Sequence, residues 1–232
     1  MNKLEGVWGD GQMKVVHGVG YEDSSLSHFT GSDIYANTNL TENDRTGFMG
    51  RYFGNIYPDY FFNPPPSPPS LQIGSIGNLI FKGPQNDFSF AVSSPNRLLQ
   101  IIENETFYNL DGLDGCTYSE KLRLLREATN TTFTYADVIT QAYDRSTDFG
   151  GYLDDSLGRQ LSIIARLIKG NLGTKVYLVT LGGFDTHNDQ IQRHQVLLNS
   201  FSEAISNFYA DLAAAGWDDS CLLYTSPSPR DA

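Results

Sequence analysis

Two short stretches of the chain carry side chains that could do chemistry. Asp185 and His187 stand with one residue between them, and Ser27 and His28 are adjacent. A carboxylate and an imidazole at this spacing are candidate ligands for a divalent metal ion, or candidate acid–base groups. A serine hydroxyl at the start of a helix meets free N–H groups and a dipole that favours anions. Activated by a metal ion, such a hydroxyl could attack a phosphate or sulfate ester.

Each of these residues also has a purely structural interpretation. Thr186 and Asp189 are spaced as in a capping box, so this loop could serve only to begin a helix. Ser27 could be a simple N-cap, with His28 packing against a neighbour or bonding to it. Arg51 is a candidate clamp for the oxygens of an anion because its guanidinium is a planar fork, although arginines more often form surface ion pairs. These alternatives stay open at the level of sequence.

Three further reactive side chains are interpreted as structural. His194 lies on the apolar stripe of a predicted helix, where a hydrogen-bonded core histidine is the simplest explanation. His17 lies inside a predicted strand and receives no chemical role. Cys116 stands in a turn-rich stretch before a predicted helix and is expected to be a half-buried thiol, not a nucleophile.

The Asp185 loop is expected between a strand and a helix. Residues 176–181 are apolar and rich in β-branched side chains, which predicts a buried strand, and Gly182 and Gly183 allow a sharp turn at its end. A helix should follow, because one apolar stripe has helical spacing: Ile191, His194, Leu197, Leu198, Phe201, Ile205, Phe208 and Leu212.

The Ser27 loop is expected to follow a second buried strand, over residues 13–19. Ligands of open α/β sheets bind beyond the carboxyl ends of the strands, so the two loops are predicted to meet at a common rim. Other strands are predicted within 71–83 and over 87–94, and helices over 4–11, 95–103, 118–129, 135–143 and 157–168.

Composition narrows the class of protein. Apolar residues make up 40% and aromatic residues 12% of the 232 residues, which indicates a globular chain. The 27 acidic residues outnumber the 16 basic ones, for a net charge of −11. This balance argues against nucleic acid and anionic membranes as partners, since both require clustered Lys and Arg. No apolar run is long enough to predict a membrane span.

Two segments resemble a known family. "LGGFDTH" at 181–187, a histidine seven residues later and the pattern "LL..F..AI..FY.DL" are similar to bacterial proteins of the domain of unknown function 1501 family. "MKVVHGVGYEDSSLSHFTGSDIYAN" at 13–37 and "TGFMGRYF" at 46–53 resemble the same family. The segments occur in the family's order and cover about a third of the chain.

The resemblance implies a fold and a chemistry. The fold would be an alkaline-phosphatase-like, three-layer α/β fold with a largely parallel sheet, in a superfamily of metal-dependent phosphate and sulfate ester enzymes. Residues 1–219 would form part of such a domain, with about 55–172 as a covering insertion. The family's other ligand-bearing strands would precede and follow this segment, so the fold is expected to be incomplete at both ends. A periplasmic or extracellular location is implied as well.

The last residues have a different character. Residues 221–232 resemble the conceptual translation of a transposase sequencing adapter, so 220–232 is interpreted as a non-native tail. The alternative is an ordinary Ser/Pro-rich tail.

The favoured hypothesis is a metal-dependent hydrolase of small phosphate or sulfate esters. In it, Asp185 and His187 hold a divalent cation, with zinc as one candidate, while Ser27 attacks the ester and His28 or Arg51 stabilises the developing charge. A catalytic zinc takes about three protein ligands, so two ligands predict weak metal binding and weak or absent activity for this fragment. The rival hypothesis is an exported, non-catalytic binding or assembly protein that retained the fold. The sequence predicts no oligomeric state.

Overall fold

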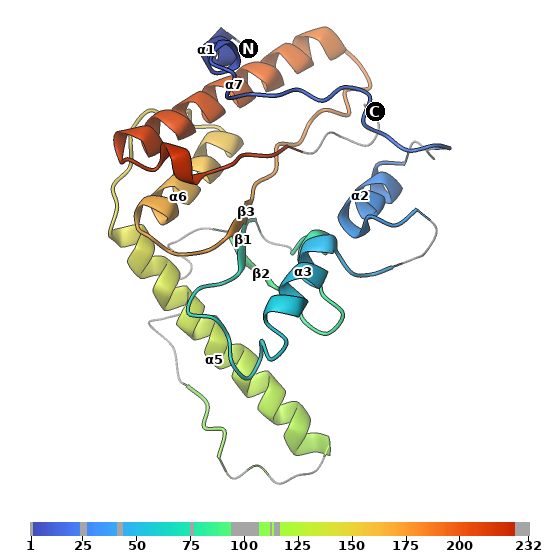
Figure 1. The fold of residues 1–232 in the computed structure, drawn as a ribbon, viewed down its shortest axis with the longest axis vertical. Coiled ribbons are helices and arrows are strands. Elements are labelled where there is room, and N and C mark those ends of the chain that lie inside the picture. Colours follow the sequence, from blue (N-terminus) through green and yellow to red (C-terminus); the bar gives the residue numbers. More distant parts are fainter. Residues whose placement is uncertain are drawn as a thin grey trace.

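The computed structural model describes residues 2–23, 27–40, 44–74, 77–93, 107–111, 113 and 117–225 (Figure 1). The helix predicted over 95–103, Cys116 and residues 226–232 lie outside the described residues. The described elements are, in chain order, η1 (Asn2–Leu4), α1 (Glu5–Gly9), α2 (His28–Asn37), α3 (Phe48–Ile56), β1 (Ser70–Ile73), η2 (Leu79–Phe81), β2 (Ser89–Val92), α5 (Thr117–Asp144), α6 (Ser156–Lys169), β3 (Val176–Leu178), α7 (Gln190–Ala214) and η3 (Asp218–Ser220).

A small parallel sheet lies at the centre of the molecule (Figure 1). Its strand order is β2-β1-β3, and Ser70 of β1 is in register with Ser89 of β2 and Val176 of β3. All four residues of β1 are buried, and the Ser70 hydroxyl donates a hydrogen bond to the Phe88 carbonyl at 2.7 Å. Parallel strands buried in this way are typical of α/β proteins, which confirms the predicted α/β class.

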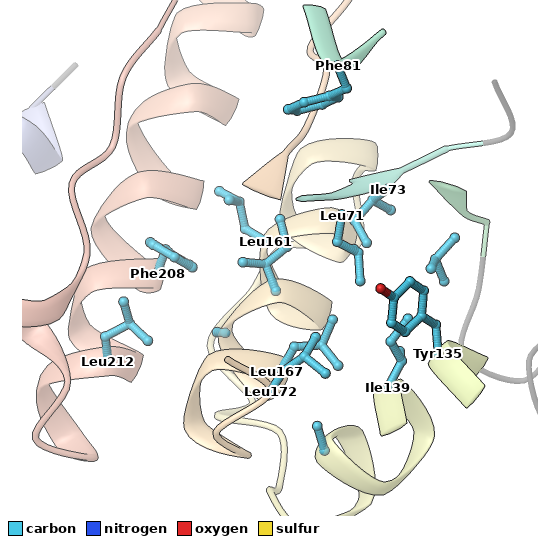
Figure 2. Close-up of a cluster of buried hydrophobic side chains, with 14 of the residues drawn as sticks. Leu71, Ile73, Phe81, Tyr135, Ile139, Leu161, Leu167, Leu172, Phe208 and Leu212 are labelled. Carbon is cyan, nitrogen blue, oxygen red and sulfur yellow. The ribbon is translucent and has the colours of Figure 1, made fainter. Parts of the chain in front are cut away.

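Helices α5 and α6 build the core around β1 (Figure 2). Leu71 of β1 is fully buried, as are Tyr135 and Ile139 of α5 and Leu161 of α6, each at 2% exposure or less. Helix α7 packs on α6 and adds Phe208 to the same cluster. Burial of each such side chain stabilises the fold by about 1.5–3 kcal/mol, so this cluster dominates the stability of the described chain.

Helix α6 forms where the sequence predicts it, because both of its ends are well defined. The Asp155 carboxylate accepts a hydrogen bond from the Gly158 backbone N–H at 2.7 Å, which satisfies one unpaired donor of the first turn. Gly170 follows the last helical residue, and its N–H donates to the Arg166 carbonyl at 2.8 Å. The predicted helix over 157–168, closed by Gly170, is therefore confirmed.

One long helix, α5, replaces two predicted helices over 118–129 and 135–143. The sequence between them is rich in threonine, whose branched side chain disfavours helix. In the structure, the hydroxyls of Thr129, Thr132 and Thr134 each donate a hydrogen bond to the carbonyl four residues earlier, at 2.8–3.0 Å. These bonds satisfy the hydroxyls within the helix, so the helix continues through the segment.

The strand predicted over residues 13–19 is wrong. Residues 12–20 are irregular, and the side chains of Val15, Val16 and Val19 are 44%, 77% and 48% exposed. His17, which was expected in a core strand, is exposed as well. A buried strand requires neighbouring strands to pair with it, and the described strands pair only with one another.

Two other predictions are confirmed only in part. Within 71–83 the chain forms β1 and the short helix η2 instead of two strands, whereas the strand predicted over 87–94 forms as β2. The apolar stripe predicted to be one face of α7 is buried only in the second half of the helix. Phe208 in that half is 2% exposed, whereas Ile191 in the first turn is 80% exposed. The second half packs on α6, and this explains the difference.

The residue range interpreted as a covering insertion supplies much of the core. Strands β1 and β2 and helices α5 and α6 all lie within 55–172. Part of the predicted tail, residues 220–232, also contacts the rest of the protein. The Leu223 N–H donates a hydrogen bond to the Tyr209 hydroxyl at 3.2 Å. Among the described helices, none combines the length and the apolar character required to cross a bilayer.

Gly170 is required by close packing of α6 against α5. A Cβ atom added at this position would lie 1.8 Å from the Ala142 carbonyl oxygen. We expect Gly170→Ala to lower the free energy of unfolding by about 1–3 kcal/mol, because the backbone of α5 must move to admit the methyl group. Urea denaturation measures the change. Gly6→Ala is the matched control, since a Cβ there meets nothing within 4 Å, and an equal loss in both variants would contradict the explanation.

A buried ion pair joins α6 to α7. Lys169 Nζ lies 2.5 Å from Asp211 Oδ1, and the two side chains are only 11% and 3% exposed. The Tyr152 hydroxyl donates to the other Asp211 oxygen at 3.1 Å. Burial, followed by the nearby Asp211 carboxylate, raises the pKa of Tyr152 above its ordinary value, so the hydroxyl stays protonated and remains a donor.

We expect Lys169→Met to lower the free energy of unfolding by about 3–5 kcal/mol, because it leaves a buried carboxylate without its counter-ion. The double variant Lys169→Met/Asp211→Leu should recover much of this loss, since neither charge then remains buried. Urea denaturation of the two variants provides the comparison. A double variant no more stable than Lys169→Met would show that packing, not the unpaired charge, explains the loss.

Candidate functional site

Two imidazoles from distant segments converge on one carboxylate, and we call His28, Asp185 and His187 the rim cluster. His187 Nε2 lies 2.9 Å from Asp185 Oδ2, which is hydrogen-bonding distance. His28 Nε2 lies 3.6 Å from the same oxygen, within ion-pair distance when the imidazole is protonated. The side chains of Asp185 and His187 follow β3, and His28 is the first residue of α2. The two predicted loops therefore do meet.

The loop after β3 is held in place from two sides. Gln160 of α6 donates to the Thr180 carbonyl at 3.0 Å and accepts from the Thr180 N–H at 3.1 Å. His194 of α7 contacts the Phe184 carbonyl at 3.4 Å, so its predicted structural role matches its position. Gly183 has a φ of +99°, a conformation that favours glycine. Gln160 was missed at the level of sequence, because nothing in its spacing relates it to this loop.

Helix α2 brings its N-terminal end to the rim. Ser27 is the N-cap: its hydroxyl accepts a hydrogen bond from the Thr30 N–H at 3.4 Å, and its carbonyl accepts from the Gly31 N–H at 2.9 Å. The predicted capping role of Ser27 is thus present. The long Thr30–Ser27 distance indicates a weak cap, and the N–H groups of this first turn point toward the helix start, where anions are favoured.

Arg51 occupies a different network, in which it joins the end of α2 to the start of α3. One terminal nitrogen donates to the Thr46 carbonyl at 3.0 Å and lies 3.4 Å from Asp44 Oδ2; the other donates to the Asn37 carbonyl at 2.8 Å. Hydrogen bonds from Thr46, its side chain first, lower the pKa of Asp44 below the ordinary value, and the Arg51 charge adds to this effect. The contacts of Arg51 are therefore those of a structural brace.

The predicted capping box at the start of α7 does not form. The N-cap of α7 is Asp189, whose backbone is left-handed (φ 49°, ψ 36°) and whose side chain accepts no capping hydrogen bond. Thr186 is buried instead, at 8% exposure. A capping box would require Thr186 as N-cap and Asp189 as the third helical residue, and α7 begins three residues too late for both.

The rim cluster is open to solvent. The side chains of His28, Asp185 and His187 are 31%, 43% and 74% exposed. An imidazole can act as a general acid or base, and a carboxylate bonded to it can hold the ring in a fixed orientation. With the start of α2 beside it, the rim offers proton transfer and anion binding at one place.

The rim does not form a complete metal site. Within the described ranges, no group of three or more His, Cys, Asp or Glu side chains is placed to hold a metal ion. The two predicted ligands also bond to each other, since the 2.9 Å contact joins His187 Nε2 to Asp185 Oδ2. A catalytic zinc takes about three protein ligands. The residues present therefore do not fit the expected zinc ion, and the proposed reaction includes no step at a metal ion.

Comparisons with known proteins found no match among family models, curated proteins or solved structures. The resemblance to the domain of unknown function 1501 family therefore stays a prediction carried by the quoted motifs.

We expect Arg51→Lys to lower the free energy of unfolding by about 1–2 kcal/mol, because a lysine cannot bridge the acceptors of both segments. It should leave the affinity of the rim for inorganic phosphate unchanged. Chemical denaturation and phosphate titration followed by NMR measure the two quantities. Arg45→Lys is the matched control, since Arg45 is exposed. Weakened phosphate binding with unchanged stability would instead identify Arg51 as an anion clamp.

Proposed function

We propose that the rim cluster is the acid–base centre of a site that hydrolyses small phosphate or sulfate esters. The observation that supports this proposal is the convergence of His28 and His187 on the Asp185 carboxylate. Surface side chains so far apart in sequence meet only when the fold holds them together, and here α6 and α7 both fix the loop that carries Asp185. Imidazole–carboxylate pairs are a common arrangement for general acid–base catalysis.

In the proposed reaction, the ester binds with its anionic group at the start of α2. The N–H groups of the first turn and the helix dipole stabilise the negative charge there. Ser27, at the N-cap, attacks the phosphorus or sulfur atom, and an imidazole of the rim cluster accepts the hydroxyl proton. The other imidazole donates a proton to the leaving oxygen, and Asp185 stabilises whichever imidazole is protonated. Water then attacks the phosphorus or sulfur atom of the Ser27 ester: the imidazole that gave up its proton accepts one from the water, and the other returns a proton to the Ser27 oxygen as phosphate or sulfate leaves.

The alkaline-phosphatase-like fold is part of the same proposal. The parallel sheet and its helices are compatible with that architecture, and the Asp185 loop follows the carboxyl end of a strand, where α/β proteins bind ligands. The proposed chemistry uses only backbone and side-chain groups of this chain and includes no metal step. The rival function, a non-catalytic binding or assembly protein, becomes one outcome of the experiment.

We expect the protein to hydrolyse 4-methylumbelliferyl phosphate or sulfate, with fluorescence as the measurement. Asp185→Asn should lower kcat/KM by about 100-fold, because a neutral amide cannot stabilise a protonated imidazole. His28→Gln should also lower kcat/KM, whereas the matched control Asp189→Asn should not. Asp189 lies in the same loop, has a left-handed backbone that asparagine tolerates, and makes no capping bond.

Two outcomes contradict this proposal. Phosphate binding to a folded protein that hydrolyses neither ester would support the rival binding function. Hydrolysis that disappears with a chelator and returns with added zinc would show that the chemistry depends on a metal ion, contrary to the mechanism given above.

A further inference from the structure

A pocket lies on the face of α3, separate from the rim cluster. Its volume is about 550 Å³, within the range of pockets that hold small organic molecules. Its walls include aromatic side chains in α3 and directly after it, together with the residues around the start of β3. None of these residues belongs to the rim cluster: Phe48, Tyr52, Phe53, Tyr57, Lys175 and Val176.

One wall of this pocket is rigid because the core supports it. Phe53 is 1% exposed, and its ring centroid lies 5.9 Å from that of Phe88 in the core. Tyr57 stacks on Phe53 at 6.3 Å with an interplanar angle of 25°. Tyr52 lies 5.5 Å from Phe53 yet is 56% exposed. The aromatic surface is therefore preformed, so a flat apolar ligand can bind without reordering the wall.

The opposite wall contributes one positive charge. Lys175 is the only charged residue in the lining, and its side chain is exposed. Its backbone N–H donates to the Pro69 carbonyl at 3.3 Å, which places it next to the start of β3. Its ammonium group forms no ion pair with any residue of the described ranges, although the chain carries 27 acidic residues.

We propose that this pocket binds a small aromatic carboxylate. The ring of the ligand lies against Tyr52 and Tyr57, which the buried Phe53 supports from behind, and aromatic rings favour such contacts with one another. Its carboxylate pairs with Lys175, a compact charge that does not require the planar geometry of an arginine site. A dianionic phosphate fits less well, because the other lining residues supply apolar surface and only a few hydroxyls.

Binding of 2-naphthoate and of its uncharged analogue 2-naphthamide, measured by isothermal titration calorimetry, tests this proposal. The wild-type protein should bind 2-naphthoate at one saturable site and more tightly than 2-naphthamide. Lys175→Met should weaken 2-naphthoate binding by about fivefold, the effect of losing one exposed ion pair, and leave 2-naphthamide binding unchanged. Tyr52→Ala should weaken the binding of both compounds, because both use the ring surface.

The matched control is Lys121→Met, an exposed lysine of α5 outside the pocket lining, which should change neither affinity. Circular dichroism confirms that each variant is folded. Equal affinity of the wild-type protein for the acid and the amide would overturn the proposal, as would an unchanged 2-naphthoate affinity in Lys175→Met. Non-saturable binding of both compounds would show only a general apolar surface and would overturn it too.

Discussion

Burial of the central strand β1 is the constraint on which the rest of the structure depends. Its backbone groups must pair on both sides because all four of its residues are removed from water. Parallel pairing with β2 and β3 satisfies them and joins residues 70–73, 89–92 and 176–178, which lie far apart in the chain. Helices α5 and α6 then cover the strand and complete the core (Figure 2).

The position of the rim cluster follows from this arrangement. Pairing with β1 sets the direction of β3, and the chain leaves its carboxyl end into the loop with Asp185 and His187. Gln160 holds the beginning of that loop against α6, and His194 holds its middle against α7. The Asp185 carboxylate then lies within reach of His28, the first residue of α2. The positions of these exposed side chains are therefore fixed by contacts of their loop with helices of the core.

Sequence patterns predicted best where the physical signal is local. Helix α6 has an N-cap, an amphipathic face and a closing glycine, and it forms as expected. The strand over 13–19 fails because an apolar segment forms a buried strand only when another strand is present to pair with it. The break expected in α5 fails for a different reason: threonine is a poor helix former on average, but its hydroxyl can bond to the preceding turn.

For the candidate site, too, the sequence predicted local features and did not predict contacts between distant residues. By itself, the sequence determined which residues have the chemistry, namely the imidazoles and carboxylate of the rim cluster and the Ser27 hydroxyl at a helix start. Only the tertiary structure decided that His28 shares the carboxylate of Asp185, that Arg51 braces α2 against α3, and that the predicted metal ligands bond to each other. Residue types and short spacings are properties of the local chain, whereas distances between remote side chains depend on how the whole core packs.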